Sequence, residues 1–386
     1  MGAVLYLLGT WPRRRRAALA GVALLGALSL GFVLLAGLGA RRSGSAWEHL
    51  RQRARGDEVV VDVANLEDAR AVAARARLVP GVENAAALAY AYVVPEGRLE
   101  DLFGGVILPL DGVTLEESFR PVLVAGRSAD PGRADEVVVN QQFVKAVGFD
   151  VGEQFTLVDP VGLIRQPVTI VGVVVHPNDF TTGSGGSVAY PTVAFSQRWD
   201  AALNELFDTL GGEVLGPSVF VSGADDLAPG ALVARLNTSM TGDDVRGVAD
   251  LTPSAGPVVD TLGLQRDGYL ALAGVAGLTS LTMLLLVLAR VTRLQPDETE
   301  ILRAVGFGTR ERVAAVLLPG ALVAAMAALG GFVVVLVGQG LVPTGLADRV
   351  SAGRRLGDDI GFIALSVLGL AAVLAGLVVL QASRSG

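Results

Sequence analysis

The sequence predicts an α-helical membrane protein with four transmembrane helices and a large extracytoplasmic α+β domain inserted between helices 1 and 2. Two observations lead to this prediction. The mean hydropathy of the 386 residues is +0.53, with 51% of residues hydrophobic and only 18% charged. The apolar residues form four long blocks without charge, and a strongly acidic segment separates the first two blocks. This composition excludes an ordinary soluble protein and a disordered chain.

Each charge-free block is long enough to cross a bilayer. A hydrocarbon core about 30 Å thick needs roughly 20 helical residues. We therefore expect transmembrane helices, surrounded by membrane lipid, over residues 17–40, 268–289, 313–343 and 360–380.

The third block is longer than a span requires. Because it contains Pro319–Gly320 and Gly330–Gly331, we expect it to tilt, to kink at Pro319 or to begin as an interfacial segment. The Gly and Ala content of the blocks suits close packing between helices. Alternatively, it reflects a proteome that is generally rich in Gly and Ala.

The distribution of Arg residues predicts the orientation of the helices. Arg13–Arg16 precede the first block, and the link 290–312 carries five further Arg residues. The positive-inside rule places both of these in the cytoplasm, together with the tail 381–386, and leaves the short loop 344–359 outside. We expect a multi-pass protein of a bacterial cytoplasmic (inner) membrane with both termini, 1–16 and 381–386, inside. Alternatively, the first block is a cleaved signal peptide, which would leave three helices and an outside N-terminus.

Residues 41–267 form the predicted extracytoplasmic domain. They hold 18 basic and 31 acidic residues, a formal charge of −13. Such a domain is long enough for a core of its own, and it will not bind anionic headgroups or nucleic acid. The net charge of −7 for the whole chain also argues against nucleic acid as a partner.

Both ends of this domain predict a two-layer α+β arrangement. Glu58–Val63 and Asn84–Val94 are typical of strands, and Leu66–Leu78 between them has helical spacing of apolar residues. Pro217–Ser222 and Leu227–Asn237 predict a further strand and helix.

The middle of the domain, about 115–195, predicts a small β-rich lobe. Glu136–Val139, Gln154–Val158 and Val168–Val175 have strand patterns. A short helix is expected over Gln141–Val147, ended by Gly148, and 181–187 is expected to be a loop.

The sequence offers no convergent set of catalytic, cofactor-binding or metal-ligating residues. The absence of Cys excludes a thiol nucleophile, a zinc–thiolate site, a disulfide and a lipid-modified Cys. No segment fits a phosphate-binding loop of the GxxxxGK[ST] type. His176 with Asp179 is too small a set for a metal site, and we interpret His176 as a surface residue beside a turn. We expect this chain not to be an enzyme and to bind no cofactor of its own.

The membrane blocks contain no Asp, Glu, Lys, Arg or His, although ion-coupled carriers usually need ionisable groups at depth. The chain therefore lacks both a nucleotide site and an ion relay. We expect it either to be driven by a partner or to be passive.

The cytoplasmic link carries the most informative motif. Pro296 suits a first helical position, the acidic residues that follow suit a helix N-terminus, and Gly306 and Gly308 end the pattern. A short amphipathic helix of this kind between two spans suits contact with a soluble protein, although a solvated helix without a partner fits too.

This segment resembles the signature of FtsX/MacB-type ABC transporter permeases, in which an I-L-R-A-L-G-A-S/T-R-like run leads into the third helix. The resemblance implies that an ATPase subunit contacts seven residues here: Glu300, Ile301, Leu302, Arg303, Gly306, Thr309 and Arg310.

A second motif resembles the periplasmic core domain of the same family, the MacB-like pattern G-R … D-E-V-V-V-N … V-G-D … V-V-G-V. It comprises Val124–Arg127, Asp135–Asn140, Gly148, Val151–Glu153 and Val168–Val173. With the order of helices and insert, the resemblance covers nearly the whole chain.

Two positions depart from the family pattern. Pro319 stands where the family often has Glu early in the third helix, and the family's Arg-rich run is diluted over 294–298. Because some relatives are about twice as long, this chain is either a complete permease or one half of a two-repeat permease.

The resemblance implies a permease subunit that pairs with a second permease chain, as a homo- or heterodimer, and binds an ABC ATPase carrying ATP and Mg²⁺. Movement would pass to the outer domain for export, for handling of lipid or lipoprotein, or for mechanotransmission to a cell-envelope protein. The alternative from the residues alone is a membrane-anchored sensor or scaffold whose outer domain binds an envelope protein without an ATPase.

Overall fold

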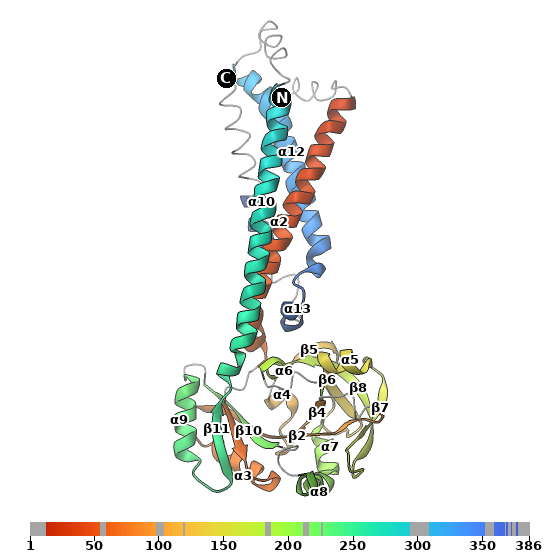
Figure 1. Cartoon of the computed structure of the whole chain (residues 1–386), viewed down its shortest axis with the longest axis vertical. Coiled ribbons are helices and arrows are strands. Elements are labelled where there is room, and N and C mark those ends of the chain that lie inside the picture. Colours follow the sequence, from red (N-terminus) through yellow and green to blue (C-terminus); the bar gives the residue numbers. More distant parts are fainter. Residues whose placement is uncertain are drawn as a thin grey trace. The chain divides into compact units, whose positions relative to one another are not determined.

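The computed structural model divides the chain into two units (Figure 1). The helical unit comprises residues 1–44, 263–348 and 354–386, and the sheet domain comprises 45–262 and 349–353. The residues described are 13–54, 59–97, 104–118, 120–181, 187–210, 216–224, 227–293, 309–351, 359–366, 368, 369, 372 and 376.

Two long helices belong to both units. Helix α2 runs from Arg13 to Arg53 and helix α10 from Gly256 to Arg293, so each extends beyond the predicted spans 17–40 and 268–289. Residues 45–53 of α2 and 256–262 of α10 are part of the sheet domain. At 1.5 Å per residue each is about 60 Å long, roughly twice a bilayer core. Pro257 suits the first turn of α10 because it needs no hydrogen bond from its nitrogen.

Helix α12 (Thr309–Gly338) is continuous through Pro319 and Gly330–Gly331. The 3₁₀ turn η2 (Gln339–Leu341) and the short helix α13 (Leu346–Val350) follow it. A further helix begins at Ile360, and much of the predicted fourth span lies outside the described residues.

Two segments of the described chain are long and apolar enough to cross a membrane, Leu19–Arg53 and Leu322–Leu341. They contain most of the first predicted span, 17–40, and most of the third, 313–343. The prediction of four spans goes beyond this finding.

The sheet domain contains a single mixed sheet of eleven strands. Its order is β11-β1-β10-β2-β4-β9-β6-β8-β7-β3, and β5 pairs with β8 beside this path. The strands are β1 (Val59–Val63), β2 (Val82–Ala91), β3 (Val94–Pro95), β4 (Gly104–Pro109), β5 (Val122–Gly126), β6 (Glu136–Asn140), β7 (Gln154–Val158), β8 (Arg165–Val175), β9 (Ser187–Pro191), β10 (Gly216–Gly223) and β11 (Val245–Asp250).

The helices of the sheet domain are short. They are α3 (Leu66–Ala76), α4 (Leu115–Ser118), α5 (Gln141–Val147), α6 (Asn178–Thr181), α7 (Val193–Arg198), α8 (Asp200–Leu210), α9 (Pro229–Ser239) and the 3₁₀ helix η1 (Thr252–Ala255). Every strand and helix predicted within this domain is present, with boundaries shifted by at most a few residues.

The two predicted lobes share one sheet, which the sequence did not indicate. Strand β2 pairs with β10 along its whole length and with β4 over Leu88–Ala91. After a break at Tyr92–Val93 the chain resumes as β3, which pairs with β7. The ladder β4-β9-β6-β8-β7 therefore closes on the bent β2–β3 strand, and the β-rich lobe is wider than the predicted range 115–195.

Each lobe has its own apolar core. Buried residues of α3 and α9, such as Val72 and Leu232, pack against Val59, Val61 and Val219 of the sheet. The closed ladder encloses a second core, centred on Phe143, Phe155, Leu157, Ile170 and Phe195.

Candidate functional site

Most of the residues predicted to contact an ATPase lie outside the described residues: Glu300, Ile301, Leu302, Arg303 and Gly306. Thr309 and Arg310 are the first two residues of α12. The ATPase contact stays a prediction. The described residues instead reveal the contacts that join α2, α10 and α12 and those that brace the sheet domain.

Helices α2 and α12 meet along a seam of glycines. A Cβ built at Gly31 would lie 2.5 Å from Val334, and one built at Gly330 would lie 2.6 Å from Ala27. Real side chains do not approach so closely, so these positions let the two backbones come together. Gly26, Gly331 and Gly338 make the same kind of approach. The predicted close packing of Gly-rich helices is thus present between α2 and α12.

Helix α10 lacks such a seam. A Cβ built at Gly263, Gly268, Gly274 or Gly277 meets nothing within 4 Å. Large apolar side chains of α10 are exposed instead, including Val275, Leu278 and Leu286. An exposed apolar surface of this extent requires apolar surroundings.

Arg42 of α2 makes several polar contacts within the described part of the helical unit. Its Nε donates to Asp359 Oδ2 at 2.9 Å, and its Nη1 donates to the carbonyls of Gln339 and Val342 at 2.8 and 2.6 Å. The Arg42 side chain is 11% exposed and that of Asp359 is fully buried. A guanidinium suits such a site because its donors point in fixed directions.

Two polar side chains of α10 contact the segment 344–347, which follows η2. The Tyr269 hydroxyl accepts a hydrogen bond from the backbone nitrogen of Thr344 at 3.1 Å and lies 3.2 Å from its hydroxyl. Gln265 Oε1 accepts from the backbone nitrogen of Ala347 at 3.1 Å. The side chain of Tyr269 also fills the space beside Gly39 of α2.

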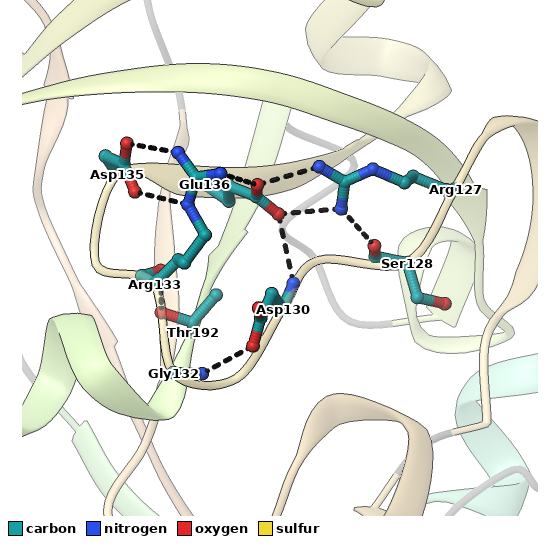
Figure 2. A network of polar contacts seen from close by, with 8 residues as sticks. All are labelled: Arg127, Ser128, Asp130, Gly132, Arg133, Asp135, Glu136 and Thr192. Carbon is teal, nitrogen blue, oxygen red and sulfur yellow. Dashed lines mark hydrogen bonds and ion pairs between the residues drawn. The ribbon is translucent and has the colours of Figure 1, made fainter.

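In the sheet domain, the second residue of the D-E-V-V-V-N motif, Glu136, has a buried carboxylate (Figure 2). Arg127 donates to both oxygens of Glu136 at 2.7 Å, and the backbone nitrogen of Asp130 donates at 3.0 Å. Arg133 lies 3.2 Å from the same carboxylate and also pairs with Asp135. These contacts hold the 126–136 loop against the start of β6.

The surroundings of Glu136 favour its charged form. The hydrogen bonds from Arg127 lower the pKa of Glu136 to about 2, more than burial raises it. Gly126 next to Arg127 has φ of +74°, and a Cβ there would collide with the carbonyl of Val171. The G-R and D-E parts of the motif are therefore one structural brace.

The motif ends with Asn140, which joins three elements. Its Oδ1 accepts from the backbone nitrogen of Phe143 at 2.8 Å, capping α5, and from that of Val188 at 3.1 Å. Its Nδ2 donates to Asp179 at 3.2 Å. Sequence patterning identified the strand but not this role of its last residue.

Asp179 of α6 is the second buried carboxyl group of this region. It accepts hydrogen bonds from the Tyr190 hydroxyl and the backbone nitrogen of His176, both at 2.8 Å. Burial raises the pKa of Asp179, and burial together with the neighbouring Asp179 raises that of Tyr190 well above its usual value. Helix α6 packs against η1, which leads directly into α10. Asp179 thus fixes the support on which α10 begins.

The interpretation of His176 as a surface residue was wrong. Its side chain is buried at 2% exposure, because the chain turns inward after β8 so that Asp179 reaches Tyr190. Within the described ranges, no cluster of three or more His, Asp or Glu residues is arranged to hold a metal ion. The buried polar groups Glu136, Asn140 and Asp179 brace the fold.

No protein-family model and no curated protein matches this chain. One solved structure found by comparison is a domain of a protein from Porphyromonas gingivalis that is described as a permease. It is 15% identical, the match covers 47% of this chain and 82% of that one, and the TM-score is 0.30. A likeness at this level assigns neither family nor activity to this chain.

Proposed function

We propose that this chain is the transmembrane permease subunit of an ABC-type complex. A separate ATPase, carrying ATP and Mg²⁺, binds the cytoplasmic segment 290–312. The sheet domain lies outside the membrane and moves when the ATPase acts. A second permease chain completes the complex, whose role is export, lipid or lipoprotein handling, or mechanotransmission.

The observation that carries this proposal is the continuity of α2 and α10. Each is an unbroken helix of about 60 Å that includes an apolar block and also belongs to the sheet domain. A rigid helix transmits displacement along its axis, whereas a flexible linker of the same length would absorb it. Two such helices suit a chain whose outer domain responds to events on the other side of the membrane.

The exposed surface of the helices supports a membrane location. Leu24 and Leu25 of α2, Leu278 of α10 and Leu329 and Val337 of α12 are all more than half exposed. Side chains of this kind in contact with water would promote aggregation, whereas lipid accommodates them.

The experiment is purification of the full chain from native membranes followed by labelling with a photoreactive ATP analogue. We expect a co-purifying subunit to be labelled and this chain not to be. Leu302→Asp introduces a charge into the coupling segment and Arg303→Glu reverses one. The double variant should no longer co-purify with the ATPase subunit or stimulate its ATPase activity.

Arg349→Glu is the matched control, since it reverses a charge in the loop expected on the opposite side of the membrane. If no nucleotide-binding subunit is recovered with the unmodified chain, the proposal fails and a scaffold that works without an ATPase is favoured. Equal stimulation by the coupling-segment variant and the unmodified chain would remove the assigned contact.

A further inference from the structure

The outer end of α12 is held by directional bonds from a neighbouring helix. Helix α12 ends at Gly338, and the carbonyls of Gln339 and Val342 just beyond it accept hydrogen bonds from Arg42 of α2. The last carbonyls of a helix carry partial negative charge and lack partners within the helix. Gln339 belongs to η2 and its carbonyl also accepts from the backbone nitrogen of Val342 at 3.4 Å, so Arg42 places a positive charge just beyond the C-terminal end of α12, where a cation is favourable.

The same guanidinium reaches the start of the last helix. Asp359 precedes Ile360, and its carbonyl accepts a hydrogen bond from the backbone nitrogen of Ile363 at 3.0 Å. Asp359 is therefore the N-cap residue of the last helix. Its carboxylate pairs with Arg42 Nε at 2.9 Å. A cation at one helix C-terminus and an anion at the next N-terminus are the favourable placements. Arg42 thus links α2 to the ends of two other helices.

The glycine seam cannot supply this link. Contacts between Gly31 and Val334 or between Gly330 and Ala27 are apolar and resist separation of α2 from α12. These contacts fit side chains such as Val334 beside glycines, so they also oppose sliding, but apolar contacts are weakly directional. A slide by one residue, about 1.5 Å, would in addition break hydrogen bonds of 2.6 to 2.9 Å. Arg42 therefore adds directional bonds that hold the axial register of α12 against α2.

We propose that Arg42 is the positioning residue that passes displacement of α12 to α2, a role that rests on the proposed function. The coupling segment 290–312 lies between α10 and α12 in the chain. A displacement of α10 reaches the sheet domain along α10 itself, because residues of both units belong to this helix. Helix α12 ends at Gly338, so its displacement must first pass to α2 through the contacts between the two helices. Asp359 holds the guanidinium in position.

The first measurement needs no ATPase. The chain has no Cys, so Phe32→Cys on α2 and Leu341→Cys on η2, both exposed, can carry a pair of spin labels in the full chain in nanodiscs. Unmodified Arg42 should give a narrow distribution of distances. Arg42→Gln should widen it about twofold or more, as expected when a directional contact is replaced by one that slides.

The second measurement uses the chain reconstituted with its co-purified ATPase. Arg42→Gln should lower stimulation about tenfold in kcat while the KM for ATP stays unchanged, because nucleotide binding is not altered. Arg42→Lys keeps the charge with fewer donors and should recover part of the stimulation. Arg41→Gln is the matched control, since the Arg41 guanidinium lies over the Phe362 ring at 4.9 Å on the same helix.

A double variant separates positioning from stability. Arg42→Gln with Asp359→Asn removes both charges, so the buried pair leaves no lone ion and the protein should accumulate normally. The inference expects the wide distance distribution and the low stimulation to persist. Three results would overturn the inference. They are recovery of the narrow distance distribution and of the ATPase stimulation in the double variant, a loss of stimulation in Arg41→Gln equal to that in Arg42→Gln, and a narrow distance distribution in Arg42→Gln. If the unmodified chain stimulates no ATPase, the proposed function fails while the label distances still decide the register.

Discussion

The contacts that stabilise the helical unit internally differ in kind from those that stabilise the sheet domain internally. The α2–α12 seam depends on the absence of side chains at five glycines and on one buried ion pair at its end. The described part of the sheet domain depends on eleven hydrogen-bonded strands, several apolar clusters and a buried carboxyl group near each end of β6. The first arrangement has few directional contacts and the second has many.

This difference bears on what each part can do. Apolar contacts along the glycine seam have little directional preference, whereas a continuous hydrogen-bonded sheet with buried carboxyl groups held by several donors resists deformation. The proposed transmission of force requires helices that shift against one another and a domain that moves as a rigid body. The predictions below test that contrast, beginning with the largest expected effect.

Filling the seam should have the largest effect. Gly31→Leu places side-chain atoms where Val334 already lies, which should destabilise the helical unit by about 3 kcal/mol or more. The loss should appear as a lower melting temperature of the full chain in detergent. Gly274→Leu in α10 is the control and should leave the melting temperature unchanged, because nothing lies within 4 Å of that position. Equal effects of the two substitutions would contradict the assigned seam.

The sequence could not distinguish these two glycines. Gly31 and Gly274 both lie in charge-free blocks of similar composition, and close packing and plain composition explained them equally well. The choice of packing partner for each helix depends on contacts between residues about 300 positions apart in the sequence, as for Gly31 with Val334. Arg42 with Asp359 shows the same limit, since no local pattern relates them.

Removing the charge of Glu136 should be the next largest effect. Glu136→Gln replaces charge-assisted bonds from Arg127 by weaker ones and should cost about 2 kcal/mol, less than a fully buried pair because the arginines are half exposed. Faster hydrogen exchange over residues 122–139 of the full chain would report it. Asp135→Asn, at an exposed partner of Arg133, should leave exchange unchanged. A similar change in both variants would show that Glu136 is not the centre of the brace.

The same carboxylate should make the sheet domain sensitive to acid. The pKa of Glu136 is about 2 in the folded chain and about 4.5 without these contacts. Its contribution is therefore complete above about pH 4.5 and is lost as the pH falls towards 2. The difference in stability between the unmodified chain and Glu136→Gln should shrink over that interval, as measured by denaturant unfolding. A constant difference from pH 5 to pH 2 would exclude this linkage.

The motif around Glu136 shows what local sequence can and cannot provide. Its alternation predicted strand β6, and Asn140 and Gly148 set the ends of α5 at the expected residues. The roles of Glu136 and Asn140 were not predicted, because their partners come from other elements. His176 was placed on the surface because a polar residue before Pro177 is typical of an exposed turn, whereas the partners of Asp179 draw that turn inside.

A smaller effect is expected at the other end of β6. Tyr190→Phe removes one hydrogen bond to the buried Asp179 and should cost about 1.5 kcal/mol. Because α6 packs against η1, hydrogen exchange should rise over 176–181 and 252–255 rather than over 122–139. An increase confined to β9 would show that Asp179 does not hold α6 in place.

The smallest effect should be that of Asp179→Asn, and its pH dependence should oppose that of Glu136. Burial raises the pKa of Asp179, so its contribution is complete below the unfolded value near 3.8 and is lost as the pH rises through the raised folded value. Asn cannot ionise but loses one acceptor facing the backbone nitrogen of His176, so at neutral pH the two changes should nearly cancel, to within about 1 kcal/mol. Denaturant unfolding should show the variant losing stability relative to the unmodified chain as the pH falls from the raised folded pKa to about 3.8, with no further change below that value. A carboxylate stabilised by an unrecognised cation would give the reverse trend, and the two ends of β6 would then be alike.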